Sequence, residues 1–181
     1  SDQFFDIAAS QSEKPFLYEK KHGVWQGQTY GEVAISVLRA AGMLRMLGVN
    51  KGDRVVIGAE NGINWAVADL AIMTLGALVV PSYSTNTMDD HLHVLTDSGA
   101  VLAITSTGAL AEKMAEAAEK AKTCKTLICF EDIALKTPTR TLMVTSWDKA
   151  LEKVDISISG EVRETLDPDD LSCLIYTSGT G

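Results

Sequence analysis

The sequence has 181 residues, of which 46% are hydrophobic, 22% charged and 6% aromatic. A chain of this length can bury the core of one domain, or of one domain with part of another, and it is too apolar for a disordered protein. With 16 basic and 24 acidic residues, its net charge is -8. An acidic surface repels phosphate backbones, so this balance argues against general nucleic-acid binding.

The cysteines and the most apolar stretch, residues 63–80, indicate the cellular compartment in which the protein is expected. Cys124, Cys129 and Cys173 are odd in number and lack Cys-x-x-Cys spacing, which argues against a disulfide framework or a zinc site and favours a reducing cytoplasm. All three lie in apolar runs, where a cysteine usually packs as a small hydrophobic residue. Residues 63–80 include Asp69, whose charge is costly in hydrocarbon, and the N-terminus lacks the pattern of a secretory signal. We therefore expect a soluble, cytoplasmic protein.

The chain begins with signals for a β-hairpin and then a long helix. Strands are predicted over 15–19 and 24–29, with a turn at 21–23. Thr29-Tyr30-Gly31-Glu32 has the form of a capping box, which satisfies two otherwise unpaired N–H groups at the start of a helix. Apolar residues then recur at helical spacing, and Gly48 can end the helix in a left-handed conformation.

Strands and helices alternate through the rest of the chain. Strands are predicted at 54–59, 77–81, 101–105, 126–130, 156–158 and 171–176, and helices at 63–75, 87–98, 110–121 and 147–153. Residues 131–145 have no clear pattern, and 167–170 form a turn. This order predicts an α/β fold with a doubly wound, mostly parallel sheet, flanking helices and a short N-terminal hairpin. In such sheets ligands bind beyond the carboxyl ends of the strands.

The last predicted strand leads directly into a hydroxyl- and glycine-rich loop, Thr177-Ser178-Gly179-Thr180-Gly181. Glycines let successive N–H groups converge on an anion, and the hydroxyls add donors without adding charge. The loop is neither a Walker A sequence nor a nucleophile elbow, because neither glycine pattern occurs. Taken alone, the five residues are equally consistent with an ordinary polar loop after a strand.

The wider sequence resembles the AMP-forming adenylating enzymes, which include acyl-CoA synthetases, luciferases and peptide-synthetase adenylation domains. Residues 174–181 are similar to the signature of that superfamily, and upstream segments match in order and type. These segments are Thr29-Tyr30-Gly31-Glu32, Lys51-Gly52-Asp53-Arg54-Val55, Pro81-Ser82-Tyr83-Ser84-Thr85 and Asp97-Ser98-Gly99-Ala100. The residues of these motifs are most similar to those of long-chain fatty acyl-CoA synthetases. The resemblance runs from about Lys14 to the last residue.

Two departures limit what the resemblance implies. The superfamily usually reads Thr-Ser-Gly-Thr-Thr-Gly-x-Pro-Lys-Gly, and here one Thr is missing and the sequence stops at Gly181. The match also covers only the leading part of such an enzyme. Residues 1–181 would be the N-terminal portion of an adenylation domain, with the acyl tunnel, the magnesium-binding Glu and the catalytic Lys downstream. We therefore expect no catalytic residue and no metal ligand within this chain.

The resemblance implies a complete enzyme that uses ATP, Mg²⁺ and coenzyme A to convert a fatty acid, or another carboxylic acid, into its acyl-CoA. Thr177, Ser178, Gly179, Thr180 and Gly181 would hold the ATP phosphates. This chain alone would bind ATP weakly or not at all and have no ligase activity. A fatty acyl substrate suits peripheral membrane association, and a homodimer is left open. The alternatives are another ligase of the superfamily, a non-catalytic α/β partner subunit, or an unrelated nucleotide-binding module.

Other candidate residues have simpler interpretations. His91 and His93 are two apart, so on a helix they point in nearly opposite directions, and a shared metal is disfavoured. The paired carboxylates at 89–90 and 167–170 suit capping and turn roles. Several large apolar residues are predicted to lie in the core or at its rim. These residues are Met43, Met46, Met73, Met114, Trp25, Trp65 and Trp147.

Overall fold

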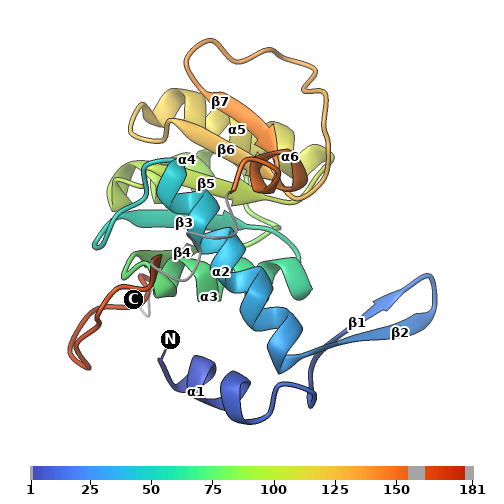
Figure 1. Ribbon diagram of the computed structural model, residues 1–181. Coiled ribbons are helices and arrows are strands. Elements are labelled where there is room, and N and C mark those ends of the chain that lie inside the picture. The colour runs from blue at the N-terminus through green and yellow to red at the C-terminus, as the bar shows by residue number, and fades with distance from the viewer. Residues whose placement is uncertain (1, 155–161, 178–181) are drawn as a thin grey trace.

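The computed structural model describes residues 2–154 and 162–177. Five parallel strands form one sheet in the order β4-β3-β5-β6-β7, with helices on both faces (Figure 1). The strands of this sheet are β3 (Arg54–Gly58), β4 (Leu78–Pro81), β5 (Leu102–Thr105), β6 (Thr126–Cys129) and β7 (Met143–Ser146). The helices are α1 (Asp2–Ser10), α2 (Tyr30–Met46), α3 (Ile63–Thr74), α4 (Met88–Ser98), α5 (Ala109–Ala121) and α6 (Trp147–Leu151).

Two hydrophobic cores, one on each face, confirm the predicted doubly wound sheet. Val55 and Ile57 belong to the core that includes α2 and α3, whereas Val56 between them belongs to the core that includes α4 and α5. Successive side chains of a strand point to opposite faces. The part of a strand that is covered on both faces must therefore be apolar, as Val55, Val56 and Ile57 of β3 are.

The local signals at the start of α2 are confirmed. Glu32 N donates to Thr29 Oγ1 at 3.3 Å, and Thr29 N donates to Glu32 Oε2 at 2.8 Å, so the capping box is complete. Gly48 has a φ of 91°, which is costly for any residue with a Cβ. The predicted antiparallel hairpin is also present, as β1 (Pro15–Lys21) and β2 (Val24–Thr29).

Several sequence-based expectations were wrong or incomplete. No helix was predicted at Asp2–Ser10, where α1 lies, and β7 begins within the stretch at 131–145 that had no clear pattern. Residues 171–176 form only an isolated bridge beside β4 and not a regular strand. The predicted edge strand at 156–158 lies outside the described residues.

Burial also corrects three residue interpretations, and the first is that of Trp25, which was expected in the core or at its rim and is exposed. Met46 and Cys173 were expected to pack in apolar surroundings, and both are exposed. Met46 lies at the end of α2, and Cys173 lies in the segment that the sheet holds only by one bridge. Met43, Met114 and Trp147 are buried as expected. Among the described residues, no helix combines the length and apolar character needed to cross a bilayer.

Candidate functional site

The segment that precedes the polar loop lies along the outer edge of β4. Cys173 pairs with Val79 in the parallel sense. Val79 N donates to Ser172 O at 3.1 Å, and Leu174 N donates to Val79 O at 2.9 Å. Because the two segments run in the same direction, Tyr176 and Thr177 come to the carboxyl end of β4. This is the end of a parallel sheet where ligands bind.

A groove of about 300 Å³ lies at this end of the sheet. Its lining comes from the end of β4, the loop that follows it, the first half of α4 and the end of the 171–177 segment. These residues are Pro81, Tyr83, Asn86, Asp90, His93, Val94, Tyr176 and Thr177. Of the five predicted phosphate-binding residues, Thr177 therefore lines the groove. Ser178, Gly179, Thr180 and Gly181 lie outside the described residues.

Tyr176 is held in the groove by contacts with α4. Its hydroxyl donates to Asp97 Oδ2 at 2.6 Å, and its ring meets that of His93 edge-on with 5.8 Å between the ring centres. Loss of solvent, which is the larger cause, and the hydrogen bond to the Asp97 carboxylate together raise the pKa of Tyr176 to about 12. Tyr176 is therefore a neutral hydroxyl donor that ties the residue before Thr177 to α4.

A buried polar cluster supports the loop between β4 and α4. Ser82 Oγ and His91 Nδ1 are 2.8 Å apart, and Asn86 Nδ2 donates to Ser82 Oγ at 3.1 Å. Lys113 Nζ, from α5, donates to the carbonyl of Asn86 at 3.2 Å. Burial lowers the pKa of His91, and the positive charge of Lys113 adds to that effect. His91 is therefore neutral, and the cluster fixes the loop that forms one wall of the groove.

The histidines and carboxylates do not converge on a metal position. His91 is buried and His93 is exposed, as their spacing on a helix predicts. Asp90 Oδ2 accepts hydrogen bonds from Thr87 N at 2.9 Å and from Thr87 Oγ1 at 2.7 Å, so this carboxylate caps α4 as expected. In residues 2–154 and 162–177, no group of three or more His, Cys, Asp or Glu side chains is placed to hold a metal ion.

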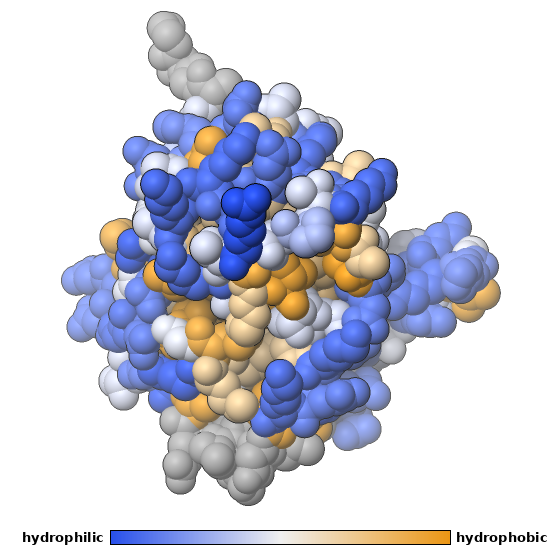
Figure 2. Space-filling model, turned by 90° about the horizontal axis from the view of Figure 1, so that it is seen from above, coloured by the Kyte–Doolittle hydropathy of each residue, from blue (hydrophilic) through white to orange (hydrophobic). Residues whose placement is uncertain are grey.

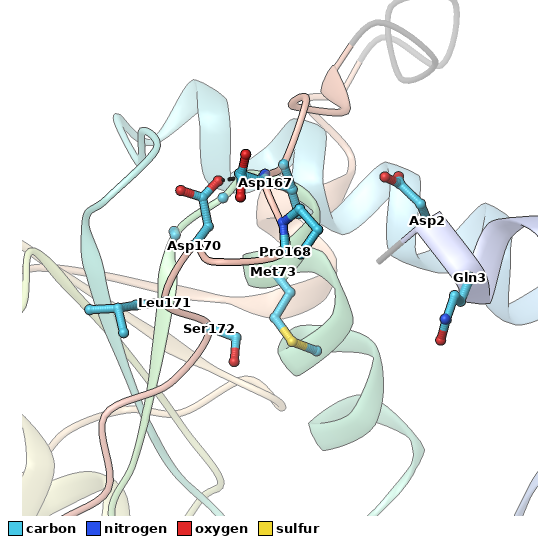
Figure 3. A pocket seen from close by; sticks show the side chains of 11 residues that line it. Asp2, Gln3, Met73, Asp167, Pro168, Asp170, Leu171 and Ser172 are labelled. Carbon is cyan, nitrogen blue, oxygen red and sulfur yellow. Dashed lines mark hydrogen bonds between the residues drawn. The ribbon is translucent and has the colours of Figure 1, made fainter.

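A second cavity, of about 350 Å³, lies at the opposite end of β4. Figure 3 shows Asp167, Pro168 and Asp170 above Met73 of α3, with Asp2 and Gln3 of α1 at the far side. Asp170 N donates to Asp167 O at 2.9 Å, which confirms the predicted turn. Asp170 also forms an ion pair with Lys51. This cavity lies at the amino end of β4, away from Thr177.

The comparisons with known proteins decide the family. A protein-family model described as "AMP-binding enzyme" matches residues 4–181, nearly the whole chain. The chain belongs to the AMP-binding enzyme family. The resemblance to the AMP-forming adenylating enzymes is thereby confirmed, and the parallel sheet with helices on both faces agrees with it.

Two curated relatives show how much of a related protein this chain matches. It is 33% identical over 158 residues to the long-chain-fatty-acid–CoA ligase FadD15 of Mycobacterium tuberculosis, a match that covers 87% of this chain and 25% of that protein. It is 31% identical over 156 residues to the peroxisomal OPC-8:0-CoA ligase 1 of Arabidopsis thaliana, with 86% of this chain and 27% of that protein covered. The chain thus spans about a quarter of the length of these relatives.

Solved structures share the fold of this chain. Coronafacic acid ligase from Pectobacterium brasiliense aligns with this chain at a TM-score of 0.82 and 14% identity. The alignment covers 97% of this chain and 33% of the ligase chain. The N-terminal subdomain of Klebsiella oxytoca NpsA, solved with 3-hydroxybenzoyl-AMSN, matches 99% of this chain and 37% of its own, with a TM-score of 0.70 at 22% identity. At these identities the likeness supports the fold alone.

Sequence reasoning missed the roles of Ser82, Asn86, His91 and Asp97 at the groove. The available signal was the position of two motifs in the resemblance, Pro81-Ser82-Tyr83-Ser84-Thr85 and Asp97-Ser98-Gly99-Ala100. In the sequence, both motifs indicate only the family. The structure brings the first to the end of β4, and it brings Asp97 of the second to the Tyr176 hydroxyl.

Proposed function

We propose that residues 1–181 are the N-terminal portion of an AMP-forming carboxylate–CoA ligase, and that a long-chain fatty acid is its substrate. The observation that carries the proposal is that Thr177, the first residue of the hydroxyl- and glycine-rich loop, lines the groove at the carboxyl end of β4. Family membership supports the reaction type. The long-chain substrate is supported by the name of the mycobacterial relative and by the motifs in the sequence.

In the proposed reaction, a carboxylate oxygen attacks the α-phosphorus of ATP and pyrophosphate leaves, which gives an acyl-adenylate. The sulfur of coenzyme A then attacks the acyl carbonyl and the thiol proton is lost. AMP leaves as the thioester forms. The role assigned to this chain is to hold the β- and γ-phosphates through the Thr177 hydroxyl and the donors of residues 178–181. Such donors stabilise the negative charge that accumulates on the leaving pyrophosphate.

The described residues do not fit the Mg²⁺ that the resemblance implies. Asp90 is the carboxylate that lines the groove, and its Oδ2 is committed to Thr87. We therefore assign no metal-dependent step to this part of the chain. For the same reason we propose that the 181 residues alone have no ligase activity and bind ATP weakly. Isothermal titration that gives micromolar ATP affinity for this chain would contradict that part of the proposal.

The test is ATP–pyrophosphate exchange by the full-length protein with a series of carboxylic acids from short aliphatic to long-chain. Exchange should be strongest with long-chain fatty acids, and exchange with none of the acids would contradict the ligase assignment. Thr177→Ala and Ser178→Ala should each raise the KM for ATP roughly tenfold or more, because a hydrogen bond to a charged group contributes about 1.5–3 kcal/mol. Thr137→Ala, at an exposed position outside the groove, is the matched control and should leave the KM unchanged.

A further inference from the structure

The β1–β2 hairpin carries apolar surface that the rest of the described chain does not cover. It projects from the body of the molecule in both views (Figures 1 and 2). Tyr18, Val24 and Trp25 are 59%, 63% and 65% exposed. An isolated two-stranded hairpin is only marginally stable in water. A surface that covered the exposed aromatic side chains would therefore stabilise the hairpin.

The register of the hairpin gathers two aromatic side chains and a lysine on one face. Lys20 lies opposite Trp25, and Tyr18 lies opposite Gly27. Directly opposed residues of an antiparallel pair point to the same face, and so do residues two apart in one strand. The Tyr18 ring lies against Gly27, where a Cβ atom would be only 2.8 Å from Tyr18 Cε1. We call this face, formed by Tyr18, Lys20 and Trp25, the aromatic face.

The charge of the hairpin is opposite to that of the chain. The hairpin, residues 15–29, contains Lys20 and Lys21 against Glu19, a formal charge of +1, whereas the whole chain carries -8. Glu19 pairs with Lys21 at 2.9 Å on the other face. Among the residues that the structure describes, Lys20 forms no ion pair. The aromatic face therefore combines apolar rings with a free positive charge.

We propose that the aromatic face and the adjoining tip of the hairpin dock on the surface of an anionic lipid bilayer. Trp and Tyr rings favour the interface between headgroups and acyl chains, and lysines are attracted to anionic headgroups. A symmetric contact between two copies through this face would bring like charges together. This inference goes beyond the proposed function and does not depend on the ligase chemistry.

The test is sedimentation of the 181-residue chain with vesicles of phosphatidylcholine alone or mixed with phosphatidylglycerol. Binding is expected only to the mixed vesicles, and it should weaken as NaCl rises from 0.05 to 0.5 M, because salt screens the attraction. Lys20→Glu/Lys21→Glu should weaken partitioning about tenfold or more, since each lysine near an anionic surface contributes about 1 kcal/mol. Trp25→Ala should weaken it without changing the salt dependence.

Matched controls separate the hairpin from general effects. Lys125→Glu/Lys136→Glu makes the same change in net charge at exposed positions outside the hairpin, and Ile35→Ala removes an exposed apolar side chain from α2. Both should bind like the parent chain. Circular dichroism checks that each variant is folded, and if Trp25→Ala unfolds, the charge-reversal pair decides alone. Equal binding by hairpin and control variants, no binding to mixed vesicles, or a dimer that Trp25→Ala dissociates would overturn the proposal.

Discussion

Ser82 Oγ lies 2.8 Å from His91 Nδ1, and both residues are buried between the sheet and α4. His91 Nε2 is also buried and has no hydrogen-bond partner among the described residues. A protonated His91 would carry a buried charge next to Lys113, and no described acceptor lies at Nε2. The hydrogen bond to Ser82 therefore holds a neutral imidazole under the wall of the groove.

The burial of His91 predicts a loss of stability in mild acid. Its pKa is lowered from the ordinary value of 6.5, so below that pH the unfolded chain binds a proton that the folded chain does not. Stability then rises with pH through this window and is lost as the pH falls. The free energy of unfolding, measured in urea between pH 5 and 7.5, should fall more steeply toward acid than that of His91→Gln. His93→Gln, at an exposed position, is the control, and equal slopes for parent and His91→Gln would contradict the interpretation.

The contact between Tyr176 and Asp97 predicts a directional change in the titration of the tyrosine. Burial and the Asp97 carboxylate together raise the pKa of Tyr176 to about 12. Asp97→Asn removes the negative charge while keeping an acceptor oxygen, so the pKa of Tyr176 should fall toward 10. The measurement is NMR titration of ¹³Cζ-labelled tyrosine, with Tyr176→Phe to assign the resonance. An unchanged pKa in Asp97→Asn would show that the hydrogen bond does not form in solution.

Glu119 on α5 predicts where the 131–142 connection is held. Its Oε1 accepts hydrogen bonds from Arg140 N, Thr141 N and Thr141 Oγ1 at 3.0–3.1 Å, and its Oε2 accepts one from Leu142 N at 3.1 Å. Glu119→Ala should raise amide exchange of residues 140–142 roughly tenfold, because three backbone donors lose their acceptor. Glu116→Ala, which removes only an exposed ion pair with Lys120, is the control. The prediction is wrong if the two variants exchange alike.

The thiols should differ sharply in reactivity. Burial raises the pKa of Cys124 and Cys129 to about 11, whereas Cys173 is exposed. Because the thiolate is the nucleophile, one thiol per chain should react rapidly with Ellman's reagent at pH 8 and the other two only after unfolding. Cys173→Ser should remove the rapid phase. A rapid phase that survives in this variant would place a second accessible thiol on the surface.

The capping box of α2 predicts a measurable stability difference. Thr29→Ala removes the Oγ1 that accepts from Glu32 N, and the loss of such a cap costs about 1 kcal/mol of unfolding free energy. Thr96→Ala, an exposed position within α4, should cost nothing, since alanine has the higher helix propensity. Urea denaturation of both variants measures the difference.

The elements that were predicted correctly are those whose signal is local. The capping box at Thr29 and the strand predicted at 54–59 depend only on neighbouring residues, and the structure has the capping box and a strand at Arg54–Gly58. By contrast, α1 is held by contacts with residues that are far away in the sequence. Phe5 of α1 packs in the core, and the guanidinium of Arg163 lies over its ring, 4.3 Å from the ring centre. Short β7 is defined by its pairing with β6. Neither partnership leaves a local pattern.

The candidate site divides in the same way. The loop that begins at Thr177 is predicted from its composition, because hydroxyls and glycines concentrate in five residues, and its role stays a proposal. The supporting residues could not be found in that way, since Ser82, His91 and Asp97 are ordinary residues until the fold brings them together. Apolar residues at 171–176 suggested a paired strand. In the structure only Cys173 bridges to β4, and Leu171 and Ile175 stay exposed.

The place of Cys173 beside Val79 has a consequence for biosynthesis. A ribosome releases β4 long before the segment that later lies along it, so the edge of the nascent sheet is open during that interval. Open strand edges invite pairing with other chains. Here β4 is only four residues long and ends in Pro81, which has no N–H to donate. Both features disfavour pairing between nascent chains on neighbouring ribosomes.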